Sequence, residues 1–306
     1  MKRTSIITVN YHQTALTVDL LRSLANTVDK ELVEVIVVDN GSLENQEMIF
    51  QTAYAGLMYI RSEQNLGFAG GNNLGIRHAT GDYLLFLNND TEVTAGFIGQ
   101  MQMEMERHPQ IGLLSPLILY FENKQKIQYA GFAPINYLTC RNRVIGHMED
   151  DSGQYNDHTV VTGYCHGAAM MCRKKDLERV GLMEEHFFLY YEELDWCEKF
   201  HRQGLKTGFT GKARIYHKES MSVGKESALK TYFMVRNRWL FIRRNASAPI
   251  ALMFSCYYLF MAIPRLLLKY LRLGRLDLFK AAWRGVKWNL THSSLSRDLG
   301  IRLPDS

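Results

Sequence analysis

The chain of 306 residues contains only five cysteines, an odd number, and no two of them form a CxxC pair. Disulfide-linked secreted domains and structural zinc sites depend on paired cysteines, so both classes are excluded and free thiols in a reducing, cytoplasmic compartment are expected. Low-complexity and highly charged segments are also missing, whereas 46% of the residues are hydrophobic. Disordered and fibrous proteins are therefore excluded as well.

The start of the chain lacks a long apolar segment, because its first apolar run ends at Asn10. A secretory signal needs a longer apolar core than this. We therefore expect residues 5–9 to form a first strand.

Acidic residues are nearly absent from the C-terminal part of the chain. Between residues 230 and 287, Asp277 is the one acid against twelve lysines and arginines, although the net charge of the whole chain is only +5. The rest of the protein is therefore mildly acidic, and the tail is strongly basic. The change in composition predicts a boundary near residue 245, between a domain at residues 1–245 and a helical extension at residues 246–306.

Strand-like and helix-like segments alternate in the first half of the chain. Apolar runs at residues 5–9, 33–39, 57–61 and 83–87 are separated by amphipathic or glycine-rich segments. This alternation is typical of an α/β fold with a mostly parallel sheet. After Pro116 the pattern becomes irregular, which predicts short strands and turns up to about residue 170.

Polar residues follow three of these strands, at the sheet edge where α/β proteins bind ligands. They are Asn10 and Tyr11 after the first strand, Asp39 to Ser42 after the second, and Asn88, Asn89 and Asp90 after the fourth. The pattern predicts a polar rim that faces a ligand.

Asp39 has two interpretations that the residues alone leave open. Its carboxylate could cap the turn that follows. It could equally accept hydrogen bonds from a pyrimidine imide or from ribose hydroxyls.

Four glycines lie in the segment NLGFAGGNNLG at residues 65–75, where a helix is expected to begin. Such a loop lets the backbone approach a diphosphate. Its spacing is neither GxGxxG nor a Walker loop, which disfavours a dehydrogenase and a P-loop enzyme.

Asp90 could cap the next helix, but two asparagines and an acid at a strand end also form an oxygen-rich corner. Such a corner suits Mg²⁺ or Mn²⁺. One protein carboxylate is enough for these ions when a nucleotide supplies further ligands.

An acidic helix start follows the aromatic run at residues 187–191. Glu192 and Asp195 share one face of a helix expected from Glu192 to Gln203, whereas Glu193 points elsewhere. These acids could simply complement the helix dipole. Apolar rings nearby also raise the pKa of a carboxyl group towards the range in which it can act as a base, and we favour this interpretation.

Taken together, four segments make the chain resemble the family 2 glycosyltransferases. SIITVNY, VIVVDNGS, NLGFAGGNNLGIRHATGDYLLFLNND and FFLYYEELDWC occur in the order and spacing of that family. The resemblance covers residues 4–245 and looks closest to the rhamnosyltransferase-type bacterial enzymes that build cell-surface polysaccharide such as lipopolysaccharide. It implies a GT-A fold, a dTDP- or UDP-sugar donor, Mg²⁺ or Mn²⁺, and inversion at the anomeric carbon.

The resemblance also implies roles for individual residues. Asp39 would hold the nucleotide base, Asp90 and His217 would bind the metal, and Glu193 would be the catalytic base. The other positions expected to line the nucleotide sugar are Thr8, Asn10, Tyr11, Gly67, Asn73, Asn88 and Asn89. The acceptor side is expected to include His166 and Trp196.

Two departures from the family pattern leave alternatives open. Asn88 replaces the first acid of the DxD motif, so Asp90 is the only acid of that motif. The expected base is Glu193 where the family usually has aspartate, and Glu192 or Asp195 could take the role instead.

The basic tail opens with an apolar run at residues 248–263 that Pro264 and Arg265 are expected to close. The run is shorter than the ~20 residues that span a bilayer. Arg265, Lys269 and Arg272 then share a helix face opposite leucines, which is typical of a helix lying on an anionic membrane surface. We expect peripheral attachment to the cytoplasmic face of the inner membrane, next to a lipid-linked glycan acceptor.

The tail could instead be a buried helix or a homo-oligomer contact. Nucleic-acid binding is disfavoured, because no recognisable module accompanies the basic residues.

Two rival functions compete with that of a glycosyltransferase. A nucleotidyltransferase that makes sugar nucleotides would carry a glycine-rich, basic loop after its first strand, but the chain has NYHQTALT there. A non-catalytic membrane-surface protein with a retained nucleotide fold is disfavoured by the joint presence of Asp39, Asp90 and the acidic helix.

Overall fold

The computed structural model describes residues 2–29, 31–218 and 226–302 of the chain. Within them a mixed sheet has the strand order β3-β2-β1-β4-β9-β6-β10-β5, and two further strands, β7 and β8, pair with β6 and β10. The strands are β1 (Thr4–Asn10), β2 (Val33–Asn40), β3 (Met58–Ser62), β4 (Tyr83–Leu87), β5 (Thr91–Val93), β6 (Ile111–Tyr120), β7 (Ile127–Tyr129), β8 (Thr159–Val161), β9 (Ala169–Arg173) and β10 (Lys206–His217).

Helices cover the sheet and continue into a C-terminal layer. They are α1 (Thr14–Thr27), α2 (Glu47–Ala53), α3 (Gly67–His78), α4 (Phe97–Arg107), α5 (Lys174–Val180), α6 (Glu192–Arg202), α7 (Ala228–Asn245), α8 (Ala248–Tyr257), α9 (Ile263–Arg272) and α10 (Leu276–Thr291). A 3₁₀ turn (Glu185–Phe187) precedes α6, and a π-helical segment (Tyr258–Ala262) joins α8 to α9.

The N-terminal half of the sheet is parallel, as the alternation of strands and helices predicts. β1 pairs in parallel with both β2 and β4, and Asn10 is in register with Asp39. β9 is antiparallel to β4 and β6, whereas β10 is parallel to β6. The polar strand ends after β1, β2 and β4 therefore meet at one edge, which confirms the expected rim.

Successive strand residues bury themselves in opposite layers, as the pleat requires. In β1, Ile6 belongs to the cluster formed with α1, α2 and α4, whereas Ile7 packs with α3, α5 and α6. The sheet is thus buried on both faces, which explains why its central strands are continuous apolar runs.

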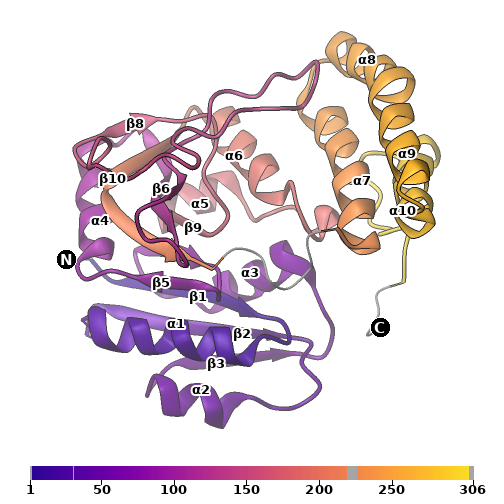
Figure 1. Ribbon diagram of the computed structural model, residues 1–306. Helices are drawn as coiled ribbons and strands as arrows, with labels where there is room; N and C mark the ends of the chain where they lie inside the picture. The colour runs from indigo at the N-terminus through magenta and orange to yellow at the C-terminus, as the bar shows by residue number, and fades with distance from the viewer. Residues whose placement is uncertain (1, 30, 219–225, 303–306) are drawn as a thin grey trace.

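The helices α7 to α10 form a separate layer at one side of the molecule, away from α1 and α2 (Figure 1). Their own apolar cluster includes Leu240, Phe254, Tyr258 and Trp288, together with Phe187 from the segment before α6. Asn289 of α10 donates a hydrogen bond to the carbonyl of Arg236 in α7. Since α7 packs on α10, the boundary near residue 245 separates two helices of one layer, and its status as a domain boundary stays a prediction.

Two prolines lie inside regular elements, Pro116 in a strand and Pro264 in a helix. Pro116 lies within β6, at the point where the register of β6 with β10 shifts between Thr210 and Arg214. A proline is tolerated at such an irregularity, because no regular ladder bond needs its missing N–H.

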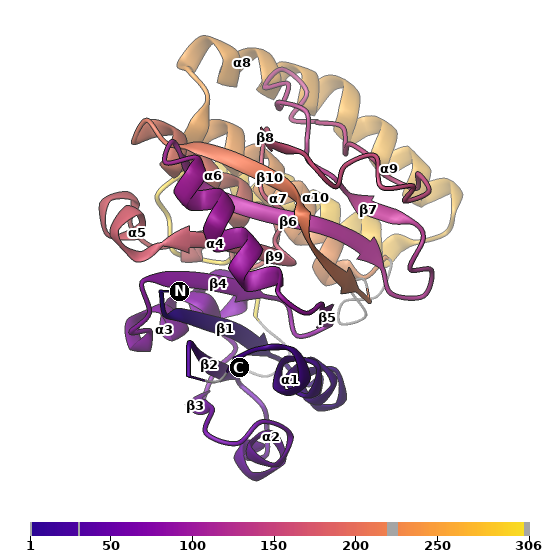
Figure 2. The same cartoon turned by 90° about the vertical axis from the view of Figure 1, so that its left-hand side faces the viewer.

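Pro264, which closes the apolar run at residues 248–263, does not end the helix of the tail. The helix runs without interruption from Ala248 to Arg272, as Figure 2 shows for α8 and α9. Pro264 cannot donate to the carbonyl of Phe260 four residues earlier, and the π-helical turn at Tyr258–Ala262 accommodates this loss.

Candidate active site

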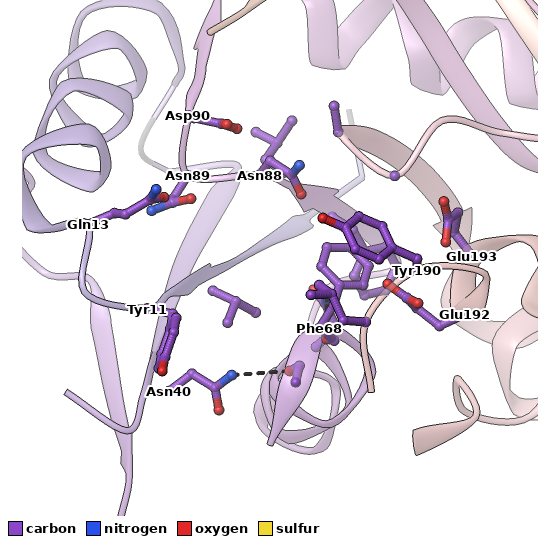
Figure 3. A pocket seen from close by; sticks show the side chains of 18 of the residues that line it. Tyr11, Gln13, Asn40, Phe68, Asn88, Asn89, Asp90, Tyr190, Glu192 and Glu193 are labelled. Atoms are coloured by element: carbon purple, nitrogen blue, oxygen red, sulfur yellow. Dashed lines mark hydrogen bonds between the residues drawn. The ribbon is translucent and has the colours of Figure 1, made fainter. Parts of the chain in front are cut away.

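A cavity of about 650 Å³ opens at the rim formed by the ends of β1, β2 and β4. Its walls come from distant parts of the chain. The lining residues with polar or ionisable side chains include Tyr11, Gln13, Asn40, Asn65, Asn72, Asn88, Asn89, Asp90, Gln128, His166, Tyr190, Glu192, Glu193 and His217. Figure 3 shows Asn88, Asn89 and Asp90 on one side of this cavity and Glu192 and Glu193 on another, with Tyr11 and Asn40 at a third position.

Asp90 and His217 form a buried corner of the cavity. The carboxylate Oδ1 of Asp90 lies 3.1 Å from Nε2 of His217, but the two atoms are not aligned for a hydrogen bond, and neither has a partner among the described residues. The other ring nitrogen of His217, Nδ1, lies 2.8 Å from Oε1 of Gln128. An amide oxygen only accepts hydrogen bonds, so Nδ1 carries the proton and Nε2 presents a lone pair.

This corner fits a divalent cation. Two ligands of an octahedral ion, each about 2.1 Å from it, lie about 3 Å apart when they are adjacent, which matches the separation of Oδ1 and Nε2. Within the described part of the chain no three His, Cys, Asp or Glu side chains converge. Asp90 and His217 would therefore hold the ion with ligands from a nucleotide and water.

Asp39 is fully buried beside the cavity and does not line it. Its carboxylate accepts hydrogen bonds from Asn10 at 3.1 Å, from the Tyr59 hydroxyl at 2.6 Å, and from Ser42. Burial and the bond to Asp39 raise the pKa of Tyr59 to about 12, so its hydroxyl stays protonated. The structure thus places Asp39 at the centre of a hydrogen-bond network.

Asn10 connects this network to the rim. Its Oδ1 accepts a hydrogen bond from Thr17, whose hydroxyl in turn accepts one from the side chain of Asn89 at 3.0 Å. Asn10 and Thr8 are both buried in β1 and lie outside the cavity lining.

The glycine-rich segment packs α3 against the sheet more than it lines the cavity. A Cβ at Gly75 would collide with the side chain of Ile7, so this glycine allows the helix to approach β1 closely. Gly67 does line the cavity, with a φ of +71° and a backbone pressed against the carbonyl of Phe188. The amide of Phe68 donates to that carbonyl at 2.8 Å, which ties the start of α3 to the segment before α6.

The segment at residues 187–191 has an unusual backbone. Phe188 has φ 62° and ψ −55°, the geometry of a γ-turn, and the amide of Leu189 donates to the carbonyl of Phe187 at 2.7 Å. Tyr190 and Tyr191 have φ values of 67° and 75°. Such conformations cost on the order of 1–3 kcal/mol each and persist where surrounding contacts enforce them.

Asn237 of α7 supplies those contacts. Its side-chain amide lies 2.8 Å from the carbonyl oxygens of Phe187 and Leu189 and 2.9 Å from that of Tyr190. Arg236, its neighbour, donates to the carbonyl of His186 at 2.9 Å. The helical layer therefore holds the backbone that leads into Glu192 and Glu193.

Glu192 and Glu193 are the acids that reach the cavity from α6. Burial, followed by the charge of Glu193, raises the pKa of Glu192 well above its usual value, and burial also raises the pKa of Glu193. One carboxylate oxygen of each has no hydrogen-bond partner among the described residues. A carboxylate with a free oxygen and a raised pKa is suited to accept a proton.

Besides Asp39, Asn10 and Thr8, three further predicted site residues lie outside the cavity. Asp195 accepts hydrogen bonds from Arg244 and Asn245 of α7, and Trp196 is in the core against Phe86, with its indole N–H donated to the carbonyl of Gly181. Asn73 instead bridges to the backbone of Met183 and to Glu185. These contacts join elements of the fold, and none of the three side chains lines the cavity.

His166 does line the cavity, as expected for the acceptor side. Burial and the neighbouring His217 lower the pKa of His166 to about 3, so its ring is neutral at neutral pH. Its Nδ1 accepts a hydrogen bond from the amide of Ala168 at 3.1 Å, which leaves the ring proton on Nε2.

Sequence reasoning missed several lining residues. Asn40 belongs to the predicted rim but received no role of its own, and Asn72 could have been found from its neighbour Asn73. Gln128 and Tyr190 could not have been assigned in this way, because β7 carries no motif and the direction of a side chain after a γ-turn is set by tertiary contacts.

Residues 5–181 match the family model of glycosyl transferase family 2. The low-salt glycan biosynthesis hexosyltransferase of Haloferax volcanii is 28% identical over 245 residues, which cover 77% of this chain and 74% of the relative. The N-acetylglucosaminyl-diphospho-decaprenol L-rhamnosyltransferase of Mycobacterium tuberculosis is 22% identical over 216 residues, covering 64% of this chain and 70% of the relative.

A similar solved structure is that of a mannosyltransferase from Pyrobaculum calidifontis in complex with GDP-Man and Mn²⁺. It superposes with a TM-score of 0.55 at 15% identity, over 96% of this chain and 76% of that one. The likeness confirms the α/β GT-A architecture that the motifs implied.

Proposed function

The chain belongs to glycosyl transferase family 2 and is a glycosyltransferase that uses a nucleotide-sugar donor, and we propose that its reaction is metal-dependent and inverting. One observation supports this most directly: a single cavity joins the Asp90–His217 corner to the carboxylates of Glu192 and Glu193. A glycosyl transfer needs positive charge beside the leaving diphosphate and a base beside the attacking hydroxyl, at different positions in one site.

The donor would extend from the Tyr11 and Asn40 end of the cavity to Asp90. In this proposal the nucleoside lies near Tyr11, with Asp39 acting through its hydrogen-bond network, and the diphosphate lies near Asn88 and Asp90. Asp90 and His217 would hold a divalent cation, Mg²⁺ or Mn²⁺, which would supply positive charge for the diphosphate leaving group.

Glu193 is the proposed catalytic base. It accepts the proton of the acceptor hydroxyl while the hydroxyl oxygen bonds to the anomeric carbon of the donor. The bond from that carbon to the diphosphate oxygen breaks, and the nucleoside diphosphate leaves with the electron pair. Attack opposite the leaving group inverts the anomeric configuration. Glu192, beside it, is the alternative base.

The proposed donor is dTDP-rhamnose, with UDP-sugars as the alternative, and the proposed acceptor is a lipid-linked glycan of cell-envelope polysaccharide synthesis. The names of relatives support this choice, since one of them is a rhamnosyltransferase named for a diphospho-decaprenol substrate.

The proposed location is the cytoplasmic face of the inner membrane, with α8 and α9 on the lipid surface. The helix Ala248–Arg272 is long and apolar enough, by length and composition alone, to cross a membrane. One face of it packs on the protein through Phe254, Tyr258 and Ile263, however, so we propose that it lies along the surface. The large apolar side chains exposed on its other face are Leu252, Met253, Phe260, Met261, Leu268 and Leu271.

The deciding experiment is release of nucleoside diphosphate by the purified protein. dTDP-, UDP- and GDP-sugars are each supplied with Mn²⁺, Mg²⁺ or EDTA and a lipid-linked acceptor extract. Metal-dependent release from one donor, with the sugar recovered on the acceptor, is expected. Formation of a sugar nucleotide would instead support a nucleotidyltransferase, and absence of both turnover and nucleotide binding would support a non-catalytic protein.

A further inference from the structure

Tyr190 has a buried hydroxyl that no described residue satisfies. The hydroxyl oxygen is inaccessible to solvent and has no hydrogen-bond partner within residues 2–29, 31–218 and 226–302. Tyr190 nevertheless lines the cavity. Buried hydroxyls are normally paired, so an unpaired one in a binding cavity indicates that a ligand supplies the partner.

The position of this hydroxyl is set by backbone contacts of the segment that carries Tyr190. Tyr190 has a left-handed φ of 67°, and its carbonyl lies 2.9 Å from the side-chain amide of Asn237. Two residues earlier, the carbonyl of Phe188 accepts from the amide of Phe68. The strained segment is thus held from α7 on one side and from α3 on the other, and the ring of Tyr190 is directed into the cavity.

The ring lies between the two chemical ends of the site. Figure 3 shows the hydroxyl end of Tyr190 pointing away from Glu192 and Glu193, towards the side of the cavity where Asn88 lies. In an in-line displacement the transferred sugar occupies the space between the leaving diphosphate and the base. A side chain between Asn88 and Glu193 is therefore next to the sugar.

The chemistry of the group suits a sugar better than a phosphate. Burial and the charges of Glu192 and Glu193 raise the pKa of Tyr190 to about 12, so the hydroxyl is neutral and can both donate and accept. A sugar hydroxyl has the same capacity, whereas a diphosphate is matched by cations.

We propose that Tyr190 is a specificity-determining residue, whose hydroxyl exchanges a hydrogen bond with one hydroxyl of the transferred sugar. This inference rests on the proposed transferase function and names the part of the donor that Tyr190 reads. A site built to hydrogen-bond a substrate hydroxyl discriminates against an analogue that lacks it, because the protein group is then left unpaired.

The test compares Tyr190→Phe with Tyr191→Phe. Tyr191 is next in the chain and has a similar φ of 75°, but its ring packs near Phe241 in the helical layer, so it is the matched control. Binding of the cognate sugar nucleotide and of the free nucleoside diphosphate is measured by calorimetry with Mn²⁺. Tyr190→Phe should weaken binding of the sugar nucleotide by about 5- to 10-fold and leave binding of the nucleoside diphosphate unchanged. Tyr191→Phe should change neither of these two affinities.

A second measurement uses wild-type protein and singly deoxygenated sugar nucleotides. For wild-type protein, removal of one particular sugar hydroxyl should reduce affinity by the same factor as Tyr190→Phe does. In the Tyr190→Phe variant, removal of that hydroxyl should reduce affinity no further. Equal binding of every deoxy analogue, or an equal effect of Tyr190→Phe on sugar nucleotide and free diphosphate, contradicts the inference alone. Failure of the wild-type protein to bind any sugar nucleotide would overturn the proposed function with it.

Discussion

Oδ1 of Asp90 and Nε2 of His217 face each other across 3.1 Å in a buried corner, with Gln128 behind the histidine ring. The arrangement leaves one carboxylate oxygen and one imidazole lone pair directed at the same space. A divalent cation in that space would take both atoms as ligands.

Asp90→Asn is expected to abolish metal-dependent transfer and to weaken Mn²⁺ binding, because the amide oxygen carries no charge to offset that of the ion. Mn²⁺ affinity is measured by electron paramagnetic resonance in the presence of nucleoside diphosphate. Asp277→Asn, a change at an exposed acid of α10, is the control. Near-normal turnover by Asp90→Asn would refute the metal assignment.

Gln128→Leu should lower Mn²⁺ affinity by about 10- to 100-fold, although Gln128 is not proposed to touch the ion. The change removes the acceptor that holds the Nδ1 proton of His217 and hence the orientation of its ring. Gln128→Glu keeps an acceptor at the same place and should restore most of the affinity. If both variants bind Mn²⁺ like the wild type, His217 is not a ligand.

Glu193→Gln is expected to reduce kcat by about 10²- to 10⁴-fold while leaving donor affinity unchanged. The wild-type rate should also fall at acidic pH. Burial raises the pKa of Glu193, so the base becomes protonated at a higher pH than an exposed glutamate would. The pH profile of kcat/KM measures this fall in rate on the acidic side.

Glu198→Gln, on the same helix but bonded to Tyr164 outside the cavity, is the control for that experiment. If the fall in kcat/KM at acidic pH is the same in Glu193→Gln as in the wild type, Glu192 is the base instead.

Glu192→Gln is expected to stabilise the protein at pH 8. The pKa of Glu192 is raised well above that of the unfolded chain, so its contribution to stability is present at low pH and is lost as pH rises through the folded pKa. Replacement by a neutral amide removes this loss. The Tm difference from wild type should be positive at pH 8 and shrink towards pH 4 in thermal unfolding scans, and a difference independent of pH would contradict the expected linkage.

Phe260→Glu should weaken binding to vesicles that contain anionic lipids. Phe260 is 78% exposed on the outward face of the helix that joins α8 to α9, and a charge there opposes insertion into the interface. Met48→Glu changes a comparably exposed apolar residue on α2, 82% exposed, and serves as the control. Vesicle sedimentation measures both, and an equal loss in the two variants would argue against a specific membrane face.

The parallel sheet and its polar rim could be predicted because both depend on local signals. A strand buried on two faces is a continuous apolar run, as Tyr83–Leu87 is, and the polar residues of a parallel strand end must meet those of its neighbours. Asn10 and Asp39 illustrate the point, since their positions at the ends of adjacent strands place them in register.

The features that the sequence could not predict depend on the direction of a side chain or on a partner far along the chain. Asp195 follows Glu192 by one helical turn, yet its carboxylate accepts hydrogen bonds from Arg244 and Asn245 of α7. Pro116 lies inside a strand and Pro264 inside a helix, because a register shift in one case and a π-helical turn in the other remove the need for their N–H groups. None of these partners can be read from a local pattern.

The π-helical turn at Tyr258–Ala262 also has a consequence for insertions and deletions. Tyr258 and Ile263 are both buried although they are five residues apart, a step that in an α-helix would rotate a side chain by roughly 140°. One residue fewer here would give an ordinary helix with both halves still in phase, so natural variants that differ by a single deletion should keep this layer. The same deletion in α7 before Asn237 would rotate its amide by roughly 100°, away from the carbonyls that it holds.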